Sequence, residues 1–160
     1  MLETDRLRLR QPELADFDFV SALWRDQKVR RYLGGPVAEG QLAARWDAYL
    51  RAPTQVGVWL VAKREDARSV GLVVVNPHQD GAGYEVSYEF ACDVWGYGLA
   101  GEAVAAVLDH LLAEGGLSQV LAETQSANLA SCRLLERLGI EEARRLVRYG
   151  AEQRLFVRRA

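Results

Sequence analysis

The 160-residue sequence lacks the features that mark a secreted, metal-binding or membrane protein. It has two cysteines, Cys92 and Cys132, which form neither a metal-ligand spacing nor a disulfide framework. No apolar run approaches the roughly 18 residues that a membrane helix needs. The first ten residues alternate charge with leucine, unlike a signal or transit peptide. We therefore expect a cytoplasmic protein in a reducing setting, with no membrane and no metal.

The sequence also lacks an excess of either charge. The formal net charge is −2, with 26% of residues charged. Only residues 144–159 are locally basic, which is typical of a solvated face, so we expect no nucleic-acid partner. Repeats and linkers are absent. The length and the 49% hydrophobic fraction predict one domain over residues 1–160 with a sizeable core.

What is present is a regular succession of strand and helix patterns. Alternating or apolar runs predict strands at 5–11, 57–63, 70–76, 84–91 and 119–125, and a final pair within 143–159. Helical spacing predicts helices at 12–24, 39–52, 102–116 and 128–139. Antiparallel hairpins come first, and a single βαβ-like crossover follows in the second half.

The glycine-rich segment 95–104, WGYGLAGEAV, has Gly96, Gly98 and Gly101 in the pattern G-x-G-x-x-G. In a dinucleotide-binding fold, the glycine loop directly follows a strand that is buried on both faces. Here the preceding strand alternates between polar and apolar residues, and residues 92–95 separate it from the first glycine. Too few residues follow Glu123 to form the remaining strands of such a fold. The backbone N–H groups at the start of a helix still favour a bound diphosphate, because they have no partner within the helix and carry partial positive charge. The alternative is that the glycines merely form a tight turn.

The segment 84–104, YEVSYEFACDVWGYGLAGEAV, resembles motif A of the GNAT superfamily of acetyl-CoA-dependent N-acetyltransferases. The Q/R-x-x-G-x-G/A signature of that motif falls on residues 95–100. Residues 2–16, 26–36 and 128–140 look like the RimJ/RimL branch of ribosomal-protein N-terminal acetyltransferases, and the resemblance runs from about residue 2 to 158. It implies an α/β (α+β) GNAT fold. The sheet would be mixed and mostly antiparallel, with six to seven strands, about four flanking helices, and a splay between its fourth and fifth strands (84–91 and 119–125).

The resemblance also implies where acetyl-CoA binds. The diphosphate is expected at Trp95, Gly96, Tyr97, Gly98, Leu99, Ala100 and Gly101. Backbone N–H groups of Phe90, Ala91 and Cys92 would bind pantetheine and the developing oxyanion. Asn128 would hold pantetheine, although from the residues alone it is equally a helix N-cap. Arg133 is the candidate to reach the ribose 3′-phosphate, but the residues alone favour a surface arginine.

Proton handling is where the chain departs from the family pattern. Leu135 stands where many GNAT enzymes place a tyrosine as general acid. Ser131, which shares a helix face with Asn128, is then the candidate to protonate the leaving thiolate, a role that the resemblance to the RimJ/RimL branch implies for the matching serine. Glu85 is the candidate base for the attacking amine, with Glu89 and Glu123 as alternatives. Trp95 in place of Gln or Arg, Cys92 in place of Pro, and a short hairpin around 148–154 are further departures.

These observations predict an acetyl-CoA-dependent N-acetyltransferase that acts by direct attack in a ternary complex. Its acceptor would be a primary amine, either a peptide or protein N-terminus or a small amine. Transfer of another acyl group, such as succinyl, and a non-catalytic CoA-binding module remain alternatives. The resemblance implies that the helices at 12–24 and 39–52, with the segment 24–35, wall one side of the acceptor site. We expect the aromatic residues Trp24, Trp46, Tyr49 and Trp59 to lie in the core or at the rim of the acceptor groove. The protein would be a monomer or homodimer.

Overall fold

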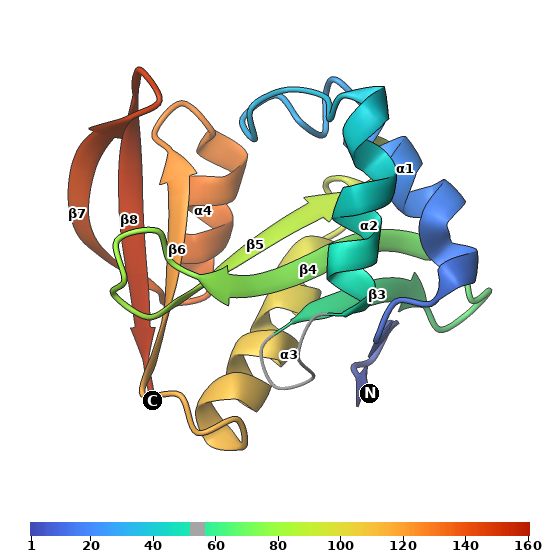
Figure 1. The fold of residues 1–160 in the computed structure, drawn as a ribbon. Helices are drawn as coiled ribbons and strands as arrows, with labels where there is room; N and C mark the ends of the chain where they lie inside the picture. The colour runs from blue at the N-terminus through green and yellow to red at the C-terminus, as the bar shows by residue number, and fades with distance from the viewer. Residues whose placement is uncertain (52–56) are drawn as a thin grey trace.

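The computed structural model describes residues 1–51 and 57–160, which form one eight-stranded sheet and four α-helices (Figure 1). The helices are α1 Phe17–Arg25, α2 Leu42–Leu50, α3 Leu99–Ala113 and α4 Leu129–Arg137. The strands are β1 Leu2–Glu3, β2 Leu7–Arg10, β3 Val58–Lys63, β4 Ser69–Pro77, β5 Tyr84–Phe90, β6 Gln119–Gln125, β7 Glu141–Arg148 and β8 Ala151–Arg159. Their order in the sheet is β1-β2-β3-β4-β5-β6-β8-β7, and every neighbouring pair is antiparallel except β5 and β6.

The sheet has one strand more than the expected six to seven, because the first predicted strand is preceded by another. β1 and β2 form a hairpin that Thr4 closes, since the Leu7 N–H donates to Thr4 Oγ1 at 3.0 Å. A two-residue strand is too short to show period-2 alternation, so no pattern in the sequence predicts β1.

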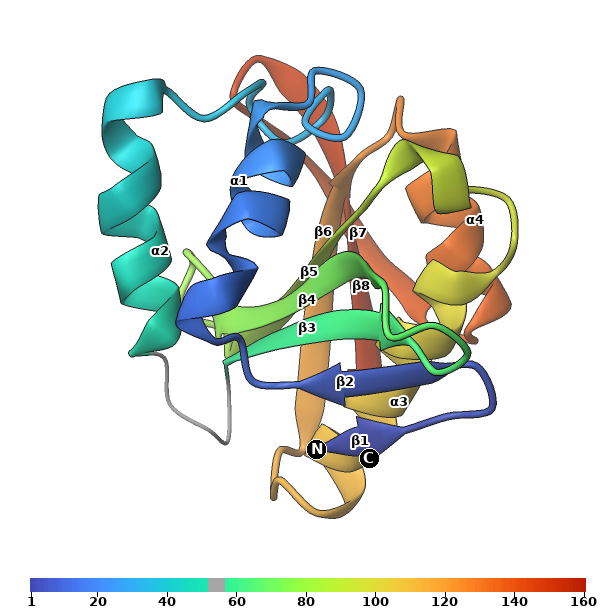
Figure 2. The same ribbon diagram turned by 90° about the vertical axis from the view of Figure 1, so that its right-hand side faces the viewer.

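The sheet is covered on both faces, as the separation of the two main apolar clusters requires. α1 and α2 pack on one face through Trp24 and Trp46, against Leu60 and Leu72 of the sheet. α3 and α4 pack on the other face, and Figure 2 shows the two helix pairs on opposite sides. Of the four aromatic residues expected in core or rim, Trp24, Trp46 and Trp59 are buried and Tyr49 is half-buried.

The helices follow the predicted pattern with shifted ends. α1 begins after a 3-10 turn at Leu14–Asp16. α3 begins at Leu99, three residues before its predicted start at residue 102. The expected end of the second helix, at residue 52, lies outside the described residues. None of the helices in the described ranges is long and apolar enough to cross a bilayer.

β5 and β6 are parallel and share a single register pair, Glu85 opposite Leu121. Beyond that point the strands diverge toward their Phe90 and Gln125 ends (Figure 1). Each strand therefore has a stretch of backbone without a sheet partner on the side of the gap. This divergence is the predicted splay, and it positions the site described next.

Candidate active site

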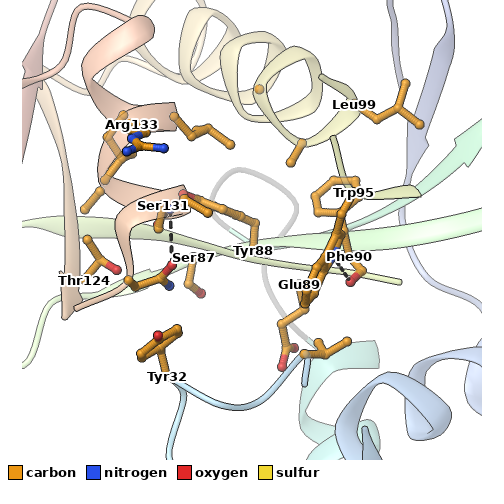
Figure 3. Close-up of a pocket in the computed structure, with 18 of the residues that line it drawn as sticks. Tyr32, Ser87, Tyr88, Glu89, Phe90, Trp95, Leu99, Thr124, Ser131 and Arg133 are labelled. Atoms are coloured by element: carbon orange, nitrogen blue, oxygen red, sulfur yellow. Dashed lines mark hydrogen bonds between the residues drawn. The ribbon is translucent and has the colours of Figure 1, made fainter. Parts of the chain in front are cut away.

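A cavity of about 880 Å³ opens at the splay between β5 and β6. Its volume lies within the range of small-molecule sites, roughly 300–1,000 Å³. It extends from the start of α3 and one side of α4, through the gap in the sheet, to the segment 28–33 between α1 and α2. Figure 3 shows this arrangement, with Ser131 and Trp95 around the gap and Tyr32 across from them.

The glycine segment forms an open cradle at the start of α3. Gly96 and Gly98 have φ of +83° and +77°, backbone that side chains rarely tolerate, and Gly98 caps the helix. A Cβ added at Gly96 or Gly101 would meet nothing within 4 Å. The first N–H groups of a helix have no partner within it, and its N-terminus carries partial positive charge. The cradle is therefore suited to an anionic group such as a diphosphate.

The N-terminal hairpin holds this cradle in place through Glu102. Arg6 forms an ion pair with Glu102 at 2.6 Å and donates to the Tyr97 carbonyl at 2.8 Å. Burial alone would raise the pKa of Glu102, but hydrogen bonds from Thr4 and Arg6 lower it. Glu102 thus stays ionised and is compensated by Arg6, so it does not cancel the positive end of the helix. The Tyr97 side chain is exposed and does not line the cavity.

Phe90 ends β5 with its backbone turned toward the gap. The Ala91 N–H donates to the Val70 carbonyl at 3.0 Å, and Phe90 lies opposite Gly71 in the adjacent register position. Because hydrogen-bonded and non-bonded pairs alternate in an antiparallel ladder, the Phe90 N–H points away from β4. Trp95, half exposed at the cavity, donates its Nε1 proton to the Phe90 carbonyl at 2.8 Å (Figure 3).

The other two expected backbone donors do not reach the cavity. The Ala91 N–H is already bonded within the sheet. Cys92, the first residue of the 3-10 turn Cys92–Val94, does not line the cavity. The Cys92 Sγ instead lies 3.8 Å from a carboxylate oxygen of Asp26. Burial, with the Asp26 charge, raises the pKa of the Cys92 thiol. Of the three positions, the structure brings only Phe90 to the gap.

The start of α4 brings Asn128 and Ser131 to the opposite wall. Asn128 is the N-cap, because its Oδ1 accepts from the Ser131 N–H at 3.2 Å. Its amide NH₂ has no hydrogen bond within the described part of the chain. Leu135, one turn further on, is 1% exposed and has no proton to give.

Ser131 has a partner that the sequence analysis missed. The Tyr88 hydroxyl lies 2.6 Å from Ser131 Oγ, and both residues line the cavity (Figure 3). Burial raises the pKa of Tyr88 to about 12, although the hydrogen bond with Ser131 opposes the shift. Tyr88 therefore keeps its proton at any ordinary pH. Strand alternation already put Tyr88 on the same face as Phe90, but its contact with Ser131 could not be read from spacing.

The chain is similar to known acetyltransferases along nearly its whole length. The family model described as "Acetyltransferase (GNAT) domain" matches residues 6–141. The chain belongs to the GNAT acetyltransferase family. The uncharacterized N-acetyltransferase p20 of Bacillus licheniformis is 26% identical over 146 residues, which cover 88% of this chain and 82% of that protein.

Two solved structures share the fold of this acetyltransferase. The GNAT-family acetyltransferase from Bacillus anthracis superposes with a TM-score of 0.87 at 21% identity, covering 99% of this chain and 97% of that one. A spermidine N-acetyltransferase from Vibrio cholerae, solved in complex with CoA and spermine, gives 0.83 at 19% identity, covering 98% and 96%. The predicted fold class is confirmed.

The acetyltransferase has three candidate carboxylates near the gap, which differ in position. Glu85 does not line the cavity, because it lies at the one position where β5 and β6 are still paired. Burial raises its pKa, and the nearby charge of Glu123 adds to the shift. Glu89 and Glu123 do line the cavity, and each is 7% exposed at its side chain.

Both lining carboxylates on this side are held by arginines. Glu89 pairs with buried Arg30 at 2.6 Å, and Glu123 pairs with Arg148 at 3.0 Å. His78 Nε2 also lies 3.3 Å from Glu123. The group His78, Asp80 and Glu123 is close enough to hold a metal ion, but Arg148 bridges Glu123 and Asp80 and already supplies the positive charge.

Proposed function

We propose that this acetyltransferase transfers the acetyl group of acetyl-CoA to a primary amine by direct attack in a ternary complex. The observation that carries the proposal is a single continuous cavity that joins the start of α3, the Phe90 N–H and the Ser131 hydroxyl. CoA bound to the Vibrio cholerae enzyme of the same fold supports the choice of donor. The likeness of residues 2–16, 26–36 and 128–140 to RimJ/RimL-type enzymes supports placing the chain near that branch.

The residues present fit the parts of acetyl-CoA one by one. The open cradle at Gly96 and Gly101 has room for the diphosphate beside the helix N-terminus. The Asn128 amide is placed to bond the pantetheine arm as it passes the start of α4. Arg133 and Arg137 line the cavity further along the same helix, where they would bind the ribose 3′-phosphate.

When bound, acetyl-CoA supplies a thioester, and the amine attacks its carbonyl carbon. The Phe90 N–H donates to the carbonyl oxygen as negative charge develops there. Ser131 donates its proton to the sulfur as the carbon–sulfur bond breaks, and solvent then returns a proton to Ser131 Oγ. A thiol has a pKa of about 8.5, so a neutral hydroxyl gives useful but modest help to this leaving group.

Tyr88 positions the Ser131 proton for that step. Either oxygen of the pair could be the donor, and we propose that Tyr88, which stays protonated with its pKa near 12, donates to Ser131 Oγ. The serine proton is then directed away from Tyr88 and into the cavity. This pair supplies the hydroxyl that the Leu135 side chain lacks.

The amine must lose a proton, and we propose that Glu85 receives it through water. An α-amino group has a pKa of about 8, so a weak base suffices. Glu89 and Glu123 each form an ion pair with an arginine, at 2.6 and 3.0 Å, so their carboxylate oxygens are already engaged. Glu85 has no ion pair among the described residues, and its raised pKa favours proton uptake.

The experiment has two parts, binding and turnover. Acetyl-CoA should raise the melting temperature, and thiol release from acetyl-CoA should require an added primary amine. Gly98→Glu should abolish the thermal shift, because it places bulk and negative charge in the cradle. Gly116→Glu is the matched control: Gly116 also has positive φ, but it lies beyond the far end of α3, where a Cβ would meet nothing within 4 Å.

An unchanged thermal shift in Gly98→Glu would overturn the cradle assignment. A thermal shift without any amine-dependent thiol release would overturn catalysis and favour a CoA-binding module.

A further inference from the structure

The charges that line the cavity are compensated unevenly. Each of its three carboxylates has an arginine partner: Glu89 with Arg30 at 2.6 Å, Glu102 with Arg6 at 2.6 Å, and Glu123 with Arg148 at 3.0 Å. The cations that line it are Lys28, Arg31, Arg133 and Arg137. None of these four takes part in an ion pair within residues 1–51 and 57–160. The cavity therefore has an excess of positive charge.

This excess is divided between two ends on opposite faces of the sheet. Arg133 and Arg137 belong to α4, on the face that holds the glycine cradle. Lys28 and Arg31 belong to the segment between α1 and α2, which cover the other face (Figure 2). The phosphates of acetyl-CoA account for the first pair. They leave the second pair, at the acceptor end, without an anion.

The segment that carries Lys28 and Arg31 is held firmly. Buried Arg30, besides its bond to Glu89, donates to the carbonyls of Gly35 at 3.0 Å and Leu33 at 2.7 Å. Gln125 of β6 donates to the Tyr32 carbonyl at 3.4 Å, which links the segment to the far side of the gap. A cation on this segment thus has a defined position relative to the cavity.

Neighbouring groups leave the two cations available to a ligand. The Arg31 guanidinium lies 5.2 Å from the centre of the Tyr32 ring, an interaction that orients it without neutralising it. Asp26 is near Lys28 in sequence, but its Oδ1 accepts the backbone N–H groups of Lys28 and Val29 at 2.8 and 3.1 Å. No carboxylate in the described part of the chain pairs with either side-chain cation.

We propose that Lys28 and Arg31 form a carboxylate-binding site for the acceptor. The acceptor is then a primary amine with a carboxylate close to its nitrogen, as in a free amino acid. Arginine and lysine bind carboxylates through charge-assisted hydrogen bonds. A polycation such as spermidine is disfavoured, because it meets uncompensated positive charge and because Arg30 already occupies Glu89. This inference rests on the proposed function.

The test compares amino acids with their own carboxamides, which keep the amine and remove the negative charge. Calorimetry with the CoA-loaded protein measures binding, and thiol release from acetyl-CoA gives kcat/KM. We expect at least one acid to exceed its amide by tenfold or more in both. Arg31→Gln should bring that acid-to-amide ratio toward one. Arg51→Gln, which changes an exposed arginine just beyond α2 that does not line the cavity, should leave the ratio as in the wild type.

The outcomes separate this inference from the proposed function. Acids that bind the CoA-loaded protein through Arg31 but are never acetylated would support the carboxylate site and refute the transferase. Amides equal to acids, no binding by any acid, or a tenfold preference for spermidine would each overturn the carboxylate site. Acetylation of the amides or of spermidine would still support the proposed N-acetyltransferase function.

Discussion

The Ser131–Tyr88 pair allows a quantitative test of the proposed proton delivery. Ser131→Ala removes the donor, and we expect kcat to fall by about ten- to a hundredfold with acetyl-CoA affinity nearly intact. Tyr88→Phe keeps the ring and removes only the hydroxyl that lies 2.6 Å from Ser131 Oγ. A neutral hydrogen bond is worth about 1 kcal/mol net, which corresponds to about a fivefold loss of kcat.

The double variant decides whether the two hydroxyls act together. If Tyr88 works only through Ser131, removing it from Ser131→Ala should cost nothing more, so the double variant should match Ser131→Ala. Independent effects would make the double variant about five times slower than Ser131→Ala. Steady-state kinetics at saturating acceptor, with separate kcat and KM, give the four corners of the cycle.

Tyr84→Phe is the matched control for this cycle. Tyr84 lies on the same face of β5 and packs on the same core, but its hydroxyl has no hydrogen bond within the described residues. Full activity in Tyr88→Phe, or additive losses in the double variant, would refute the role of Tyr88 in positioning the Ser131 proton. Full activity in Ser131→Ala would show that solvent protonates the thiolate.

Two further predictions concern titrating groups near the gap. The folded-state pKa of Tyr88, about 12, lies above its ordinary 10.0, so the contribution of Tyr88 to stability is full below pH 10 and is lost as the pH rises to about 12. At 1.36 kcal/mol per pKa unit, the free energy of unfolding should fall by about 3 kcal/mol over this range. Denaturant unfolding at each pH should show this fall in the wild type but not in Tyr88→Phe. For Glu85→Gln we expect about a tenfold lower kcat/KM near neutral pH, since the amine proton loses its acceptor. Glu65→Gln, in the exposed β3–β4 turn, is the control, and equal activity in the two variants would mean that bulk water takes the proton.

The sequence predicted those features of the fold that depend on residues close together in the chain, namely its helices, its longer strands and the glycine turn. Alternation and helical spacing placed most of the strands and helices. The glycine pattern indicated that the chain turns from a strand into a helix there, and in the structure Gly96 and Gly98 have positive φ. These features depend on a few neighbouring residues. The two-residue β1 is the exception, because it is too short to carry a period.

Contacts between distant segments could not be predicted in the same way. Tyr88 and Ser131 are 43 residues apart, and their contact depends on how α4 packs beside β5. Which of Phe90 and Ala91 offers its N–H to the gap depends on the phase of the β4–β5 ladder. Glu85 and Glu89 share a strand face, and the point where β6 separates decides which of them reaches the cavity.

Trp95 provides an optical signal that needs no label. The other three tryptophans, Trp24, Trp46 and Trp59, are 0%, 5% and 6% exposed, and none of them lines the cavity. Trp95 is 50% exposed beside the glycine cradle, where a seated nucleotide would displace water from the indole. Intrinsic fluorescence should therefore follow cofactor entry and exit on the stopped-flow timescale, with Trp95→Phe as the blank.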